Sequence, residues 1–189
     1  QVWRVLIDPL NVTFDGDELQ RLMSVLRTDD NQAVCRIALF QLSTGARLNE
    51  ALSATWAHLD RENRVWRIPA TNSKSKRMRS VPLNDIALEV LTQVGTEGKH
   101  DHVFINAETG KPYVTIAKVW NRLRTAAGLP HLRLHDLRHS FASFLVNSGR
   151  TLYEVQKVLG HSDTKVTERY AHLSTKTLQD AANSASLII

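Results

Sequence analysis

Along most of this 189-residue chain, apolar residues recur every three or four positions, which is the spacing of an amphipathic helix. The first such stretch runs from Asp15 or Asp17, either of which can cap a helix, to about Arg27. The same spacing, helped by polar caps and glycine breaks, predicts helices at residues 31–43, 47–50, 85–94, 114–127, 136–147, 151–159, 164–171 and 174–183. The chain is therefore predicted to be mainly α-helical.

One part of the chain alternates apolar and polar residues instead. Residues 65–69 and 78–83 each alternate and carry a proline at or near their end, which predicts two short antiparallel strands. The loop between them, 70–77, is polar and basic. Such a loop is often only a solvated turn, but it could equally lay Lys74 or Lys76 into a DNA groove. The predicted fold class is mainly α with a small antiparallel β-hairpin or sheet.

Composition narrows the class of protein only a little. Apolar residues make up 42% and charged residues 23%, as in ordinary globular domains, and the net charge of +5 moderately favours a polyanionic partner. The single cysteine, Cys35, excludes an intrachain disulfide and a cysteine-based zinc site, and its apolar neighbours predict burial. No signal peptide or membrane-length apolar run is present, so we expect an intracellular protein. Because the chain begins at Gln1, we expect a piece of something longer.

Candidate chemistry is concentrated between residues 135 and 170. His135 and Arg138 are three residues apart, so on a helix they share a face and can point at one anion. His161 follows Leu-Gly, and Tyr170 lies in a polar Thr-Glu-Arg-Tyr sequence unlike a core face. Taken singly, these residues are more typical of a solvated face or of packing. Together, a phenol, imidazoles and a guanidinium indicate a nucleophile, a proton acceptor and a charge clamp.

A further cation lies upstream, just after the break at residues 43–45. Arg47 and Glu50 are three residues apart at the start of the short predicted helix. One interpretation is a surface ion pair that contributes under about 1 kcal/mol. The other is that Glu50 orients Arg47 from behind while the guanidinium faces a phosphate.

Taken in order, these residues resemble the tyrosine recombinases of the phage integrase family. The resembling motifs, which span roughly residues 15–175, are Thr44-Gly-Ala-Arg-Leu-Asn-Glu50, Lys74 with Arg79-Ser-Val-Pro-Leu83, His135-Asp-Leu-Arg-His139, Leu159-Gly-His161 and Arg169-Tyr-Ala-His172. The family's lysine stands eight residues before the proline of its Val-Pro pair, which selects Lys74 by its distance from Pro82. Lys76 lies in the same loop and stays an alternative.

The resemblance implies a tyrosine-recombinase catalytic domain over residues 1–189, without the family's N-terminal core-binding domain. It implies a site-specific DNA recombinase or integrase that cleaves and rejoins DNA through a 3′-phosphotyrosyl intermediate, without metal, ATP or other cofactor. Tyr170 would attack the phosphodiester, His135 would accept the phenol proton, and Lys74 would protonate the leaving 5′ oxygen.

The remaining catalytic candidates would stabilise charge. Arg47 and Arg138 would clamp the non-bridging oxygens of the transition state, and His161 would donate a further hydrogen bond to the same phosphate. These cations would supply what magnesium supplies in many phosphoryl-transfer enzymes, and the candidate set offers no carboxylate cluster to bind a metal.

Three alternatives stay open at this point. Histidines recur every four residues at His131, His135 and His139 and could line a helix face for zinc. A type IB topoisomerase would use the same phosphotyrosine chemistry but rejoin the same strand. A DNA-binding module could keep the fold and lose catalysis, although all six catalytic positions carry competent residues.

The expected partner is double-stranded DNA, and we expect no association with a membrane. The resemblance implies a tetramer on DNA, assembled by exchange of the segment after the tyrosine helix, and a monomer for the isolated fragment. The apolar tail Leu187-Ile188-Ile189 leads us to expect that residues 178–189 dock on this chain or on a neighbouring copy. The expected location is the cytoplasm, associated with the nucleoid.

Overall fold

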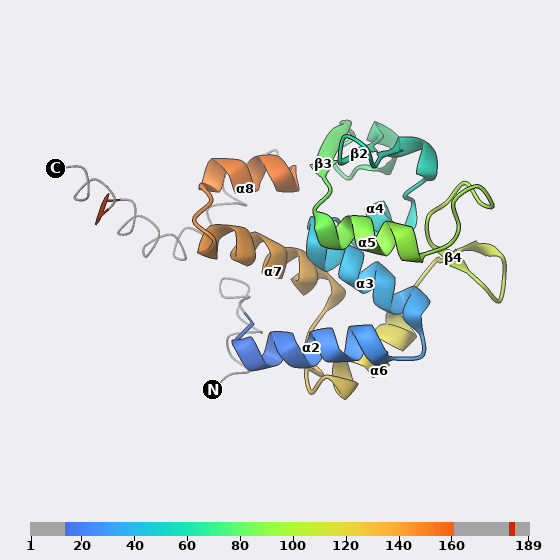
Figure 1. Cartoon of the computed structure of the whole chain (residues 1–189), viewed down its shortest axis with the longest axis horizontal. Coiled ribbons are helices and arrows are strands. Elements are labelled where there is room, and N and C mark those ends of the chain that lie inside the picture. The colour runs from blue at the N-terminus through green and yellow to red at the C-terminus, as the bar shows by residue number, and fades with distance from the viewer. Residues whose placement is uncertain (1–13, 161–181, 184–189) are drawn as a thin grey trace.

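The computed structural model describes residues 14–160 and 182–183 (Figure 1). The helices in this part, including two short 3₁₀ turns (η), are α2 Gly16–Thr28, α3 Gln32–Thr44, α4 Leu48–Leu52, η1 Trp56–His58, η2 Ala70–Asn72, α5 Asp85–Gln93, α6 Ala117–Ala126, α7 Leu134–Asn147 and α8 Leu152–Leu159. The strands are β1 Leu59–Asp60, β2 Val65–Ile68, β3 Arg79–Pro82, β4 Ile105–Asn106 and β5 Lys111–Pro112. The predicted fold class, mainly α with small antiparallel sheets, is confirmed.

The predicted hairpin is β2 with β3, paired so that Trp66 faces Val81 and Ile68 faces Arg79. The strand β1 extends this sheet in the order β1-β2-β3, and β4 pairs with β5 in a separate sheet. The sequence prediction missed β1, β4 and β5, because a strand of two residues is too short to show an alternating pattern.

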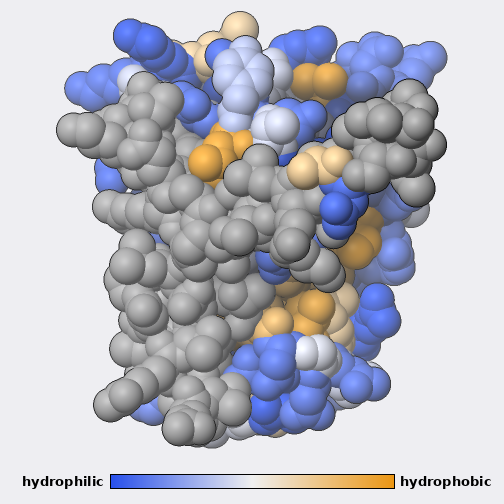
Figure 2. Space-filling model, turned by 90° about the vertical axis from the view of Figure 1, so that its left-hand side faces the viewer, coloured by the Kyte–Doolittle hydropathy of each residue, from blue (hydrophilic) through white to orange (hydrophobic). Residues whose placement is uncertain are grey.

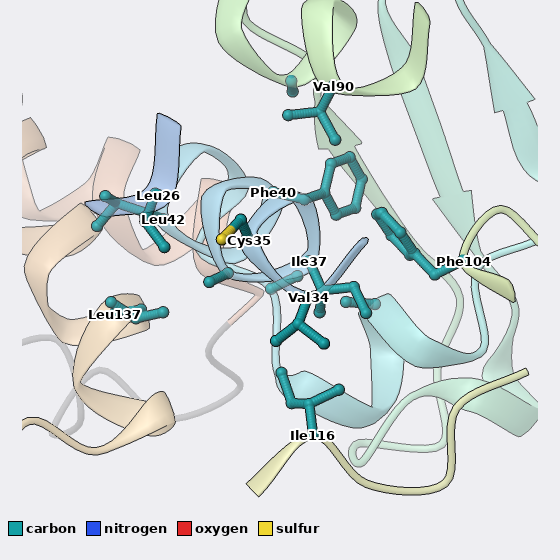
Figure 3. Close-up of a cluster of buried hydrophobic side chains, with 14 of the residues drawn as sticks. Leu26, Val34, Cys35, Ile37, Phe40, Leu42, Val90, Phe104, Ile116 and Leu137 are labelled. Carbon is teal, nitrogen blue, oxygen red and sulfur yellow. The ribbon is translucent and has the colours of Figure 1, made fainter. Parts of the chain in front are cut away.

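The centre of the fold is α3, which contacts α2, α4, α5 and α7. Its side chains are buried on nearly every face, as expected of a helix that is apolar all round. Figure 3 shows the core that surrounds it, where Phe40 lies between Val90 and Phe104. Cys35 is buried here as predicted, and burial raises the pKa of its thiol to about 11.

Three predicted helices differ from the observed ones by two or more residues at one end: 47–50 is α4 Leu48–Leu52, 136–147 is α7 Leu134–Asn147, and 114–127 is α6 Ala117–Ala126. The helix predicted at 114–127 begins at Ala117, because the Thr115 hydroxyl accepts the Ala117 backbone N–H (3.2 Å), and Val114 is exposed. In α5 the side chain of Ile86 is exposed. Of the two proposed caps of α2, Asp15 is the one that accepts a backbone N–H, from Glu18 (2.7 Å).

Hydrophobic side chains also reach the surface, as Figure 2 shows for the face turned to the viewer there. An apolar groove is lined by side chains of α2, α3, α5 and α7, among them Leu19, Met23, Leu39, Ile86, Phe141 and Phe144. Within residues 14–160 and 182–183, no helix combines the length and the apolar character needed to cross a membrane.

Candidate active site

Arg47 is placed by the start of α4. It is the residue before the first turn, and its backbone N–H donates to Oε2 of Glu50 (2.9 Å), in the manner of a helix cap. Its Nη1 also donates to Oε1 of the same carboxylate (3.3 Å). The predicted contact between Arg47 and Glu50 is thus confirmed, and it leaves the Arg47 side chain 26% exposed, at the edge of solvent.

Glu50 is shared by a second arginine. Its side chain is only 1% exposed, and Arg79 from β3 donates to both of its oxygens, at 2.7 and 3.4 Å. Burial opposes ionisation of the Glu50 carboxyl, but hydrogen bonds and charge from Arg79 and Arg47 outweigh it and lower its pKa below the ordinary value. A charged carboxylate therefore stands behind Arg47 and fixes its direction. Arg79 was not among the catalytic residues predicted from the sequence.

Arg138 lies on α7 and is almost fully buried, at 3% exposure. Its Nη1 donates to the carbonyl of Gly45 (2.5 Å) and its Nη2 to the carbonyl of Leu159 (2.7 Å). These carbonyls end α3 and α8, where the helix dipoles favour a positive charge. The guanidinium thus holds together the C-terminal ends of two helices, which are followed in sequence by Arg47 and by His161.

The start of α7, which carries both His135 and Arg138, repeats the cap seen in α4. Arg133 precedes the helix, and its backbone N–H donates to Oδ2 of the fully buried Asp136 (2.8 Å). Leu132, just upstream, accepts from the indole Nε1 of Trp120 (3.0 Å), which ties this turn to α6. The acidic residue in each helix start therefore sets the position of the basic residues around it.

Lys74 lies in the loop between β2 and β3, where η2 leads into the buried Ser73. It lines a surface pocket together with Arg47, Glu50 and Asn72. Lys76, whose backbone φ is +52°, is not among the residues that line this pocket. The structure therefore brings Lys74 and Arg47, which are predicted site residues from distant parts of the sequence, to one hollow of the surface.

The imidazole of His135 lies in the electrostatic field of Arg138 and Arg47. Although His135 is exposed, desolvation by the surrounding protein, followed by the charges of Arg138 and Arg47, lowers its pKa below the ordinary value. The ring of His139 packs edge to face against it, with centroids 4.6 Å apart. A histidine with a lowered pKa is neutral at pH 7, which is the form that can accept a proton.

The zinc alternative finds no support in the described part of the chain, where no group of three or more histidine, cysteine or acidic side chains could hold a metal ion. Two predicted catalytic residues, His161 and Tyr170, lie outside the described residues. The same holds for the predicted helix at 164–171 and, apart from positions 182–183, for the predicted helix at 174–183 and the tail 178–189. Their predicted roles stay predictions.

The sequence profile of the phage integrase family matches residues 13–177. The chain belongs to this family. The integrase of Salmonella phage P22 is 33% identical over 162 residues, 79% of this chain and 41% of that protein. Tyrosine recombinase XerC of Bifidobacterium longum (strain DJO10A) is 31% identical over 174 residues, 84% of this chain and 48% of that protein. The chain spans about half the length of the curated relatives that it matches.

Solved structures agree with this assignment. The catalytic domain of bacteriophage HP1 integrase superposes with a TM-score of 0.69 at 27% identity, covering 90% of this chain and 93% of that one. The XerH recombinase bound to its difH substrate superposes with a TM-score of 0.71 at 27% identity, covering 92% of this chain and 54% of that one. The expected tyrosine-recombinase catalytic-domain fold is confirmed.

The histidine pair predicts a loss of stability in mild acid. Burial and the neighbouring His135 lower the pKa of His139 to about 4, whereas in the unfolded chain it is near the ordinary 6.5. Between these values the unfolded state binds more protons, so the free energy of unfolding should fall as the pH drops from about 6.5 to about 4. Urea unfolding at a series of pH values measures this slope. It should be smaller for His139→Gln, and an identical slope in the variant would contradict the assignment.

Proposed function

We propose that this chain is the catalytic domain of a site-specific DNA recombinase or integrase that works through a 3′-phosphotyrosyl intermediate. The observation that carries the proposal is the convergence of cations around one surface hollow. Arg47, Lys74 and Glu50 line it, and Glu50 holds Arg47 in place. Arg138 joins the helix end that precedes Arg47 to the helix end that precedes His161. Fixed cations of this kind suit a phosphodiester whose charge grows in the transition state.

In the proposed reaction, the Tyr170 oxygen attacks the phosphorus while its proton passes to neutral His135. The bond from phosphorus to the 5′ oxygen breaks, and Lys74 supplies the proton to that leaving oxygen. Arg47, Arg138 and His161 hold the non-bridging oxygens. The ester with tyrosine keeps the energy of the broken bond, so a 5′-hydroxyl from another DNA end can reverse the step without a cofactor.

Covalent capture tests the proposal. The chain is incubated in EDTA with a pool of labelled duplexes that have a randomised sequence and a nick a few nucleotides 3′ of the candidate cleavage positions. Cleavage frees the short strand, which diffuses away, so the protein stays linked to DNA and appears as a shifted band in denaturing gels. Sequencing the captured DNA then gives the preferred target.

The outcomes separate the alternatives. Capture followed by joining of different strands supports a recombinase, whereas relaxation of supercoiled plasmid without recombinants supports a topoisomerase of type IB. DNA binding without any covalent band would reduce the chain to a binding module and would contradict the proposal.

We also propose that the partner is double-stranded DNA and that copies assemble on it as a tetramer by exchange of residues 178–189, with a monomer in its absence. The apolar Leu187-Ile188-Ile189 supports an exchange of this kind, and the apolar groove beside α7 has the matching chemistry. The proposed location is the cytoplasm, in association with the nucleoid. Light scattering with and without captured DNA tests the assembly, and truncation after residue 177 should prevent it.

The general acid is tested by a sulfur substrate. A 5′-bridging phosphorothiolate leaves as a thiolate, which needs little protonation. Lys74→Ala should therefore cleave normal DNA slowly and the sulfur substrate at close to the wild-type rate. Lys76→Ala, in the same loop, is the matched control and should cleave both substrates normally. If Lys76→Ala instead cleaved normal DNA slowly and the sulfur substrate at close to the wild-type rate, the general acid would be Lys76.

A further inference from the structure

The helix α8 contacts the rest of the described fold mainly through α7 and β3. Its buried side chains, Val155 and Leu159, belong to a small hydrophobic cluster with α7 that is separate from the main core. Packing against α7 fixes one side of α8. The position of its C-terminal end, which leads to His161, depends on further contacts with the body of the domain.

Two guanidinium groups supply these contacts at successive carbonyls. Arg138 donates to the carbonyl of Leu159 (2.7 Å), and Arg79 donates from Nη1 to the carbonyl of Val158 (3.1 Å). Carbonyls in the last turn of a helix lack partners within the helix and carry partial negative charge. The sheet, through β3, is thus attached directly to the end of α8.

Arg79 makes a second attachment with its other nitrogens. Its Nη2 donates to Oε2 of Glu50 (2.7 Å), and Glu50 in turn binds Arg47. The Arg79 side chain is 9% exposed, whereas its neighbour Arg77 is exposed. A continuous set of polar contacts therefore runs from Arg47 through Glu50 and Arg79 to the end of α8.

Gly160 leaves the room that this arrangement needs. It ends α8 with φ at +67°, and a Cβ added there would lie 2.5 Å from Cδ of Arg79. A side chain at this position would meet both a strained backbone and the Arg79 stem. The helix end and the arginine therefore fit each other closely.

We propose that Arg79 is a positioning residue that sets the position of the C-terminal end of α8 relative to Arg47. The inference rests on the proposed function, and it assigns Arg79 no contact with DNA. Its planar fork spans a carboxylate on one side and a carbonyl on the other, which a single ammonium group cannot reproduce. A small misplacement of catalytic groups costs much rate, so loss of the fork should slow cleavage more than it weakens binding.

The test compares Arg79→Lys with Arg77→Lys, using a nicked duplex that carries the target sequence recovered by covalent capture. Arg79→Lys keeps a positive charge beside buried Glu50, so the fold is expected to persist, as checked by thermal melting. Hydrogen exchange should be faster at the backbone amides of residues 157–160 in Arg79→Lys than in wild type. Single-turnover cleavage at saturating DNA should fall about 10- to 100-fold with unchanged affinity, while Arg77→Lys should leave exchange and cleavage unchanged.

A second variant guards against a general charge effect. Glu50→Gln with Arg79→Gln removes both charges without leaving either one buried and unpaired, and it should also speed exchange at the end of α8. Exchange is the readout for this variant, because Glu50→Gln also removes the carboxylate that pairs with Arg47. Unchanged exchange in both variants would overturn the inference, as would faster exchange with wild-type cleavage. Absence of any adduct in the wild-type chain would instead overturn the proposed function, whatever the exchange rates are.

Discussion

Replacing Tyr170 with phenylalanine is expected to abolish the covalent protein–DNA adduct while folding and DNA binding persist. The change removes the attacking oxygen and almost no volume, so it removes the nucleophile and little else. The measurement is the shifted band formed with the captured nicked duplex, read beside a binding titration and a melting curve. No other group in the predicted site can form the same 3′-phosphotyrosyl ester.

Tyr153 provides the matched control. It lies on α8, is 66% exposed, and has the Lys157 ammonium 5.2 Å from its ring centroid. A cation near an exposed tyrosine makes it the alternative nucleophile within the described residues. Tyr153→Phe should form the adduct at the wild-type rate. An adduct that persists in Tyr170→Phe and disappears in Tyr153→Phe would transfer the assignment.

Loss of Arg47 or Arg138, the two arginines proposed to clamp the phosphate, should slow cleavage by about 100- to 1000-fold, by analogy with the loss of one oxyanion donor. The structure separates the two variants by their effects on the fold. Arg47 is partly exposed, and its partner Glu50 keeps Arg79, so Arg47→Ala should retain stability. Arg138 is buried and holds two helix ends, so Arg138→Ala should lower the melting temperature as well.

Single-turnover rates at saturating DNA, set beside dissociation constants, test this expectation. Binding should fall much less than cleavage, because a domain bound to duplex DNA as proposed would contact many other phosphates. Arg64→Ala is the control for loss of one positive charge, since Arg64 is 56% exposed and pairs with Asp85 outside the site. Equal losses of binding and cleavage in the Arg47 and Arg138 variants would show that both arginines only add affinity.

The sequence by itself determined the local structure and the order of the candidate groups. Spacing and side-chain chemistry within a few residues account for most helices of the described part, the hairpin of β2 and β3, and the cap at Asp15. The contact between Arg47 and Glu50 is also local, because residues three positions apart at the start of a helix are neighbours. The motif order indicated the family, which the profile match then established.

Only the tertiary structure decided what the buried arginines touch. Arg138 reaches a carbonyl 93 residues away, and Arg79 reaches Glu50 and Val158 at separations of 29 and 79 residues. No periodicity records such contacts, since they depend on how α3, α7, α8 and the sheet pack together. In the sequence Arg77 and Arg79 look alike. Packing exposes one and buries the other against a carboxylate and a helix end, because a buried carboxylate requires a cation and unpaired terminal carbonyls favour one.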